Sequence, residues 1–104
     1  MDKVTFEAFE AGARAEGFDE VVERVWAART VIASHTHPFA VKALVVQGEM
    51  WLTVGDDVRH LLPGGSFALE RDERHAERYG DDGATYWVAR RNRASARFVS
   101  RRRR

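Results

Sequence analysis

The sequence contains no cysteine among its 104 residues, and this absence limits both its cross-links and its metal chemistry. Disulfides cannot form and thiolate ligands are not available, so a metal ion would have to be held by histidine, aspartate, glutamate or backbone oxygen. A chain of this length has room for one domain with one hydrophobic core. We therefore expect a single site to carry the function.

Long apolar runs are also missing, because no stretch approaches the roughly 18 to 20 apolar residues that span a bilayer. The sequence begins with Met1, Asp2 and Lys3 and lacks the basic and apolar regions of a secretory signal. These absences predict a cytoplasmic protein with no membrane partner. Hydrophobic residues make up 44% of the chain, which is enough for a folded core.

Acidic residues are absent from residues 90–104, which contain eight arginines. The preceding residues carry nine basic and sixteen acidic side chains, so the body has a formal charge of −7 and the C-terminal end +8. A terminal run of one charge can bind phosphate backbones, contact the acidic body or pair with a neighbouring subunit, but it is more often a solvated end. No nucleic-acid-binding pattern accompanies the run, so nucleic acid is not an expected partner. We predict one domain over residues 1–92 and a flexible arginine-rich tail over residues 93–104.

Short β-rich runs separated by turn residues fill the sequence from Val21 onward, a pattern typical of an all-β sandwich or barrel. Before them, Thr5 can cap a short helix in which Phe6 and Phe9 share a face and which ends before Gly17. The predicted strands are Glu20–Trp26, Thr30–His35, Val41–Gln47, Met50–Val54, Val58–Leu62, Ser66–Leu69, His75–Tyr79 and Thr85–Ala89. The predicted turns contain glycine and occupy residues 48–49, 55–57, 63–65 and 80–83.

The segment from His35 to Phe39 is the most informative for chemistry. Alternate residues of a strand point to the same face, so the imidazoles of His35 and His37 can reach one ion. Pro38 cannot donate a ladder hydrogen bond and suits the end of a strand, where a barrel mouth would leave a metal accessible to a small ligand. Taken alone, the pair is equally consistent with two polar residues at the rim of a strand.

The order of residues around this pair resembles the first motif of the cupin family. His35, His37 and Gly48 match the motif, while Val41 takes the place of its glutamate. Three imidazoles without that carboxylate would leave a bound cation with its full double charge. Some cupin dioxygenases are similar in lacking the carboxylate, so Val41 does not exclude an enzyme.

A later segment resembles the second cupin motif. The Pro63–Gly65 turn and His75 match it, whereas residues 70–72 replace its Pro-x-Gly and Tyr79 replaces its asparagine. The resemblance implies a small cupin-type β-barrel, a double-stranded β-helix or jelly roll of roughly six to eight strands, which the short N-terminal helix inferred above precedes. It also implies homodimers and a metal inside the barrel.

The resemblance implies that His35, His37 and His75 hold a divalent metal ion. Imidazole is a borderline ligand, so Fe, Mn, Ni, Cu and Zn all remain candidates. Glu77 follows His75 by two residues and would share its side of a regular strand, as a fourth ligand, a partner of a ligand, a general base or an ordinary surface residue. Tyr79 is a further candidate for handling protons. A lone histidine, His60, could also face the interior, although such a residue is more often packing.

Three classes of function remain open. The first is a dioxygenase-like, metal-dependent oxidoreductase that binds a small organic molecule beside the metal and in which Glu77 or Tyr79 handles protons. The second is a non-catalytic module that binds or senses a small ligand. The third is a structural barrel without an occupied site, and the retention of three histidines argues against it.

Overall fold

A computed structural model of the protein describes residues 4–92. One helix, α1 (Phe6–Ala15), precedes six strands. The strands are β1 (Glu20–Trp26), β2 (Val31–His35), β3 (Ala40–Val54), β4 (Asp57–Leu61), β5 (Ser66–Leu69) and β6 (His75–Arg91). The predicted tail of residues 93–104 lies outside the described residues.

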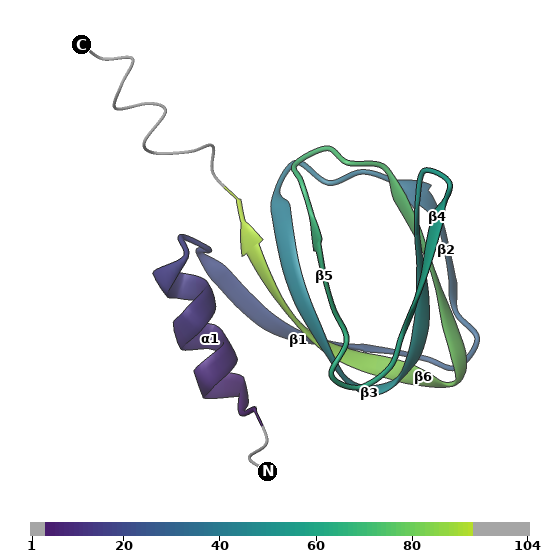
Figure 1. The fold of residues 1–104 in the computed structure, drawn as a ribbon, viewed down its shortest axis with the longest axis horizontal. Coiled ribbons are helices and arrows are strands. Elements are labelled where there is room, and N and C mark those ends of the chain that lie inside the picture. The colour runs from purple at the N-terminus through teal and green to yellow at the C-terminus, as the bar shows by residue number, and fades with distance from the viewer. Residues whose placement is uncertain (1–3, 93–104) are drawn as a thin grey trace.

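Two long strands, β3 and β6, build the barrel because each belongs to both of its walls (Figure 1). In the first wall the C-terminal half of β6 pairs with β1, and the N-terminal half of β3 pairs with β5. In the second wall the N-terminal half of β6 pairs with β2, and the C-terminal half of β3 pairs with β4. All pairs are antiparallel, and β3 and β6 also pair with each other along both walls. The prediction of an all-β, cupin-type barrel is confirmed.

The prediction of eight separate strands is wrong at two glycine-containing segments. Residues 48–49 and 80–83 were expected to be turns, but they are bends inside β3 and β6. Gly48 and Gly83 have φ angles of 81° and 70°, and a Cβ atom on Gly48 would collide with the carbonyl oxygen of Gly83. The pairing of β3 with β6 shifts register beside this contact, between Gly48 and Met50. The glycines therefore allow each strand to turn from one wall to the other without ending.

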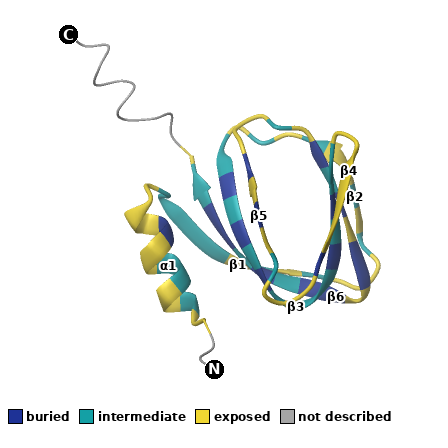
Figure 2. Ribbon diagram, in the orientation of Figure 1, coloured by how far each residue is buried: buried dark blue, intermediate teal, exposed yellow. Residues whose placement is uncertain are grey.

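The core lies between the two walls and is made by alternate residues of the strands. Val41, Ala43 and Val45 are buried along the first half of β3, and the residues between them are only partly buried. The same alternation appears as dark blue bands on the strands of Figure 2, whereas α1 is mostly exposed. Period-two burial is the pattern that a strand produces when one face lines a core.

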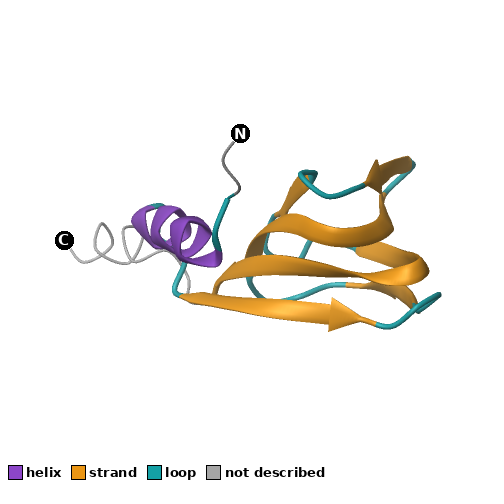
Figure 3. Cartoon of the chain, turned by 90° about the horizontal axis from the view of Figure 1, so that it is seen from below, coloured by secondary structure: helices purple, strands orange, loops and turns teal. Residues whose placement is uncertain are grey.

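The N-terminal helix lies outside the barrel, against the first wall (Figure 3). Thr5 caps α1, since its hydroxyl oxygen accepts a hydrogen bond from the Ala8 backbone N–H at 3.1 Å, as the sequence predicts. Phe6 and Phe9 pack on the outward-facing ring of Trp87, with ring centroids 5.6 and 6.0 Å from it. Within residues 4–92, no helix is long and apolar enough to cross a membrane.

Candidate metal centre

The structure brings His35, His37 and His75 together although they come from two separate parts of the chain. His35 ends β2 and is the direct cross-strand partner of His75, the first residue of β6. His37 lies beyond the end of β2, in the connection to β3, rather than two residues along the same strand. One ligand nitrogen from each of the three side chains lies within 4.8 Å of the other two.

Backbone carbonyl groups orient two of these rings. The Nδ1 atom of His35 lies 2.7 Å from the Ala33 carbonyl oxygen, and that of His75 lies 3.0 Å from the Glu73 carbonyl oxygen. An Nδ1–H that donates to a carbonyl leaves the lone pair on Nε2, which is the tautomer that a metal ligand needs. The third ring, His37, is held by stacking on Phe39 at 4.8 Å.

The surroundings of the histidines favour different protonation states. Burial lowers the pKa of His37, and the neighbouring His75 and His35 lower it further. Burial also opposes the charged form of His75, but hydrogen bonds to Glu77 and to the Glu73 carbonyl outweigh it and raise the pKa of His75. Both nitrogens donate only in the protonated ring, whereas a metal ligand is the neutral ring with its lone pair on Nε2. The cluster therefore has one imidazole that resists protonation, His37, and one whose protonated form a carboxylate stabilises, His75.

Glu77 presents its carboxylate to the same cluster. Its Oε2 atom lies 3.3 Å from His75 Nε2 and 3.7 Å from His35 Nε2, and the side chain is 8% exposed. Burial alone would raise the pKa of Glu77, but hydrogen bonds from His75 and Tyr79 outweigh it and hold that pKa below the usual value. Glu77 is therefore an ionised carboxylate inside the barrel and not a surface glutamate.

Tyr79 contacts the other carboxylate oxygen of Glu77. Its hydroxyl donates a hydrogen bond to Glu77 Oε1, and its ring stacks on Trp26 with centroids 5.3 Å apart. Burial, together with Tyr86 and Glu77, raises the pKa of Tyr79 far above its usual value, so the hydroxyl remains protonated. The structure thus places the Tyr79 hydroxyl against the Glu77 carboxylate.

The donor set fits a divalent metal ion. Metal–nitrogen bonds of about 2.0–2.1 Å separate neighbouring ligand atoms of a tetrahedral site by about 3.3 Å. The three imidazole nitrogens lie within 4.8 Å of one another and would have to approach by up to about 1.5 Å to reach that spacing, and Glu77 Oε2 lies 3.3 Å from His75 Nε2. Glu77 brings a carboxylate to the cluster from β6, whereas Val41 on β3 brings none.

A cavity of about 120 Å³ adjoins the cluster and is lined by His35, His37, His75 and Glu77. Apolar and aromatic side chains form most of its remaining wall, namely Trp26, Ile32, Phe39, Val41, Phe67, Leu69, Tyr86 and Val88. Two arginines, Arg24 and Arg90, also line the cavity, and the sequence reasoning missed them. The sequence did contain a signal for their position. Arg24 follows Val22 by two residues and Arg90 follows Val88 by two residues, so each arginine shares the inward face of its strand with a valine.

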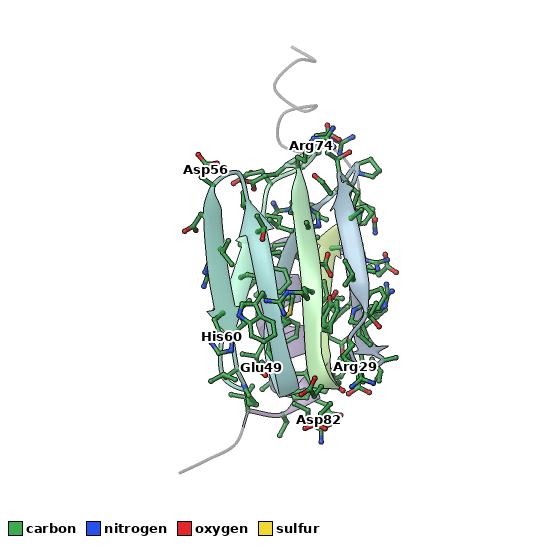
Figure 4. The ribbon with its side chains drawn as sticks, turned by 90° about the vertical axis from the view of Figure 1, so that its right-hand side faces the viewer. Arg29, Glu49, Asp56, His60, Arg74 and Asp82 are labelled. Carbon is green, nitrogen blue, oxygen red and sulfur yellow. The ribbon has the colours of Figure 1, made fainter. Side chains whose placement is uncertain are left out.

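His60, the remaining histidine, lies outside the barrel. Its Nε2 atom lies 2.5 Å from Glu49 Oε2, and its ring stacks on Trp51 at 4.8 Å. Figure 4 shows His60 and Glu49 on the outer face of the second wall, away from the end that carries Arg74, the residue before His75. The structure therefore does not bring His60 to the cluster.

Comparisons with known proteins agree with this architecture. The sequence profile of the AraC-like ligand binding domain family matches residues 17–101. A search of the curated proteins finds no match.

Solved structures, among them two described as cupins, resemble the fold at low sequence identity. A chain from the crystal structures of the DMSP lyases RdDddP and RnDddQII superposes with a TM-score of 0.64 and 21% identity over 68% of this chain, which covers only 37% of the lyase chain. An RmlC-like cupin from Shewanella frigidimarina gives a TM-score of 0.60 and 22% identity, over 76% of this chain and 69% of that one. The cupin domain of an XRE family transcriptional regulator from Enterobacter cloacae gives 0.62 and 16%, over 78% and 87%. The chain thus has a cupin fold and belongs to the AraC-like ligand-binding domain family.

Proposed function

We propose that the protein binds one divalent metal ion through His35, His37 and His75 and uses it to hold a small organic molecule in the adjoining cavity. The observation that carries this proposal is the convergence of three imidazole nitrogens within 4.8 Å of one another at the wall of a cavity. Histidine clusters of this kind suit Fe, Mn, Ni, Cu or Zn, because imidazole selects weakly among them.

Glu77 is the fourth donor in this proposal. Its ionised Oε2 atom already lies 3.3 Å from His75 Nε2, and a carboxylate there would neutralise half of the charge of the cation. Tyr79 is a positioning residue, because its hydroxyl holds the other carboxylate oxygen and prevents the side chain from turning away. The proton-transfer role that the sequence suggested for Glu77 or Tyr79 stays a prediction.

The activity that we propose is that of a dioxygenase-like oxidoreductase. A bound metal ion of this type supplies Lewis acidity and, if it is redox-active, one-electron chemistry. The chain itself orients the small molecule against the histidines and limits its size. The apolar lining, including Ile32, Phe67 and Leu69, excludes water from the bound molecule.

A second candidate is a non-catalytic domain that binds or senses a small ligand. Two observations favour it, since the matching family is described as a ligand-binding domain and one similar structure is the cupin domain of a transcriptional regulator. In this case the same metal and cavity would hold a ligand without turning it over.

Titration of chelator-treated protein with Co(II) tests metal binding, because Co(II) absorbs visible light according to its ligands. We expect one equivalent to saturate the spectrum of the wild type, and no such spectrum for His37→Ala. A wild-type spectrum that is unchanged from free Co(II) would contradict the proposal. Oxygen uptake by the Fe(II)-loaded protein with small organic acids then separates the candidates: uptake supports an oxidoreductase, and ligand binding without turnover supports the sensor.

A further inference from the structure

Two inward-facing arginines share the cavity with the histidine cluster. Arg24 lies on β1 opposite Tyr86, and Arg90 lies on β6 between its cross-strand partners Glu20 and Val41. Both are partly buried, and both line the cavity of about 120 Å³. The guanidinium group of an arginine that faces the inside of a barrel loses hydration, which costs free energy. An anion bound beside the guanidinium group offsets this cost.

The chain itself compensates these guanidinium groups only in part. Arg90 Nη1 lies 3.6 Å from Glu20 Oε2, a pair that is open to solvent because the Glu20 side chain is 40% exposed. Arg24 lies over the ring of Trp26, 4.8 Å from its centroid, and forms no ion pair with any carboxylate of residues 4–92. The guanidinium group of Arg24 therefore has N–H groups that can donate hydrogen bonds to a bound molecule.

The cavity has an excess of positive charge. Glu77 is the one acidic side chain among the described residues that line it, and Glu77 faces His75 and His35. Within the lining, the two arginines are thus opposed by one carboxylate, which already faces two histidines, and Glu20 pairs with Arg90 from outside the lining. A divalent metal ion at the histidines would add two further positive charges. The electrostatic potential in the rest of the cavity would then disfavour a positively charged small molecule.

We infer that the molecule bound in this cavity is a small organic anion, with its carboxylate or phosphate group against Arg24 and Arg90 and its other end toward the histidines. This inference deepens the proposed function. It rests on that function for the position of the other end of the molecule, toward the histidines. Planar guanidinium groups recognise both kinds of anion through paired N–H donors. The cavity is small compared with the roughly 300–1,000 Å³ of pockets for larger ligands, and its apolar wall suits a short carbon chain.

Isothermal titration with four probes tests the inference: acetate, propionate, succinate and ethyl phosphate. Succinamide serves as the neutral counterpart of succinate. The titrations are made on Zn(II)-loaded and on chelator-treated full-length protein, and the metal content of each sample is measured. We expect at least one anion to bind and succinamide not to bind, with the carboxylates and ethyl phosphate reporting which anion is preferred.

Substitutions then test the assigned residues. Arg24→Gln and Arg90→Gln should each weaken anion binding about tenfold or more, because each removes charge-assisted hydrogen bonds. Arg24→Lys keeps the charge and should retain part of the affinity. Arg29→Gln is the matched control, since it removes the same charge from a side chain that is 74% exposed and does not line the cavity, and it should change nothing. All four variants should keep the metal content and thermal unfolding of the wild type.

Failure of the inference and failure of the proposed function give different results. Binding of no anion by the metal-loaded wild type, equal binding of succinamide, or equal weakening by Arg29→Gln would each overturn the inference while the metal site stands. Wild-type protein that binds anions through Arg24 but holds no metal would overturn the metal proposal and leave the anion site in place.

Discussion

His75 is the most constrained side chain of the proposed metal centre. It is 2% exposed, its Nδ1 atom contacts the Glu73 carbonyl, and its Nε2 atom faces Glu77. A side chain held on both ring nitrogens has little freedom to leave the cluster, so it should contribute more to metal retention than an exposed histidine.

The first prediction compares His75→Ala with His60→Ala. Loss of His75 should reduce bound metal by at least tenfold, whereas loss of His60, on the outer face beside Glu49, should leave it unchanged. Equilibrium dialysis followed by elemental analysis measures both. Equal loss from the two variants would mean that the metal binds elsewhere.

The second prediction concerns the buried pair of Glu77 and Tyr79. Tyr79→Phe keeps the ring that stacks on Trp26 but removes the donor to a buried carboxylate, so the free energy of unfolding should fall by about 1–3 kcal/mol. Metal affinity should fall about tenfold because Glu77 is no longer held. Denaturant unfolding and metal titration measure the two effects, and unchanged affinity would remove the positioning role of Tyr79.

At this scale the sequence predicted part of the site. The spacing of His75 and Glu77 placed both on one side of a strand, because period two is a local property, and the structure agrees. The position of Tyr79 behind Glu77 was not predicted. Arg24 and Arg90 were not predicted either, because their approach to the histidines depends on closure of the barrel by residues distant in the sequence.

At the scale of the elements, the bends of β3 and β6 are the feature that lets two strands serve both walls. Gly83 has a φ of 70°, and a Cβ atom there would collide with the carbonyl oxygen of Trp26 at the end of β1. Backbone groups cannot move aside as a flexible side chain can. The bend therefore depends on the absence of a side chain at this residue.

The third prediction follows from this contact. Gly83→Ala should lower the free energy of unfolding by about 2 kcal/mol or more, because the substitution combines a backbone clash with an unfavourable φ. Gly12→Ala is the control, since a Cβ atom on that helical residue meets nothing within 4 Å, and it should stabilise the protein by roughly 0.5–1 kcal/mol. Thermal or denaturant unfolding of both variants gives the comparison, and a neutral Gly83→Ala would contradict it.

The sequence located the elements better than it located their connections. The cap at Thr5 and the ends of β1 and β5 agree with prediction, since capping residues and alternation are local signals. The segments around Gly48 and Gly83 have the composition of turns, and only the contact between the two strands makes them bends. That contact joins residues far apart in the chain, so composition alone does not report it.

At the scale of the whole molecule, an apolar outer face of the first wall remains partly uncovered beside α1. Val4, Leu44, Val46 and Trp87 line a shallow cavity of about 610 Å³ there, and Val4 is 57% exposed. A surface of this kind is typical of a contact between proteins. It agrees in character with the homodimer that the cupin resemblance implies.

The fourth prediction is therefore a homodimer that forms through this face. Light scattering at high micromolar concentration should give twice the mass of the chain, and Leu44→Lys should halve it. Val58→Lys places the same charge on an exposed residue of β4 in the other wall and should leave the dimer intact. A monomeric wild type would remove the homodimer from the account.

The measurement that tests the central claim most directly is elemental analysis of protein purified without chelator or affinity-tag metal. The same analysis is made on a double variant, His35→Ala with His37→Ala. We predict about one equivalent of Fe, Mn, Ni, Cu or Zn in the wild type and none in the variant, whose far-ultraviolet circular dichroism should remain that of a β protein. Absence of metal from the wild type, even after reconstitution, or equal metal in both proteins would contradict the three-histidine site.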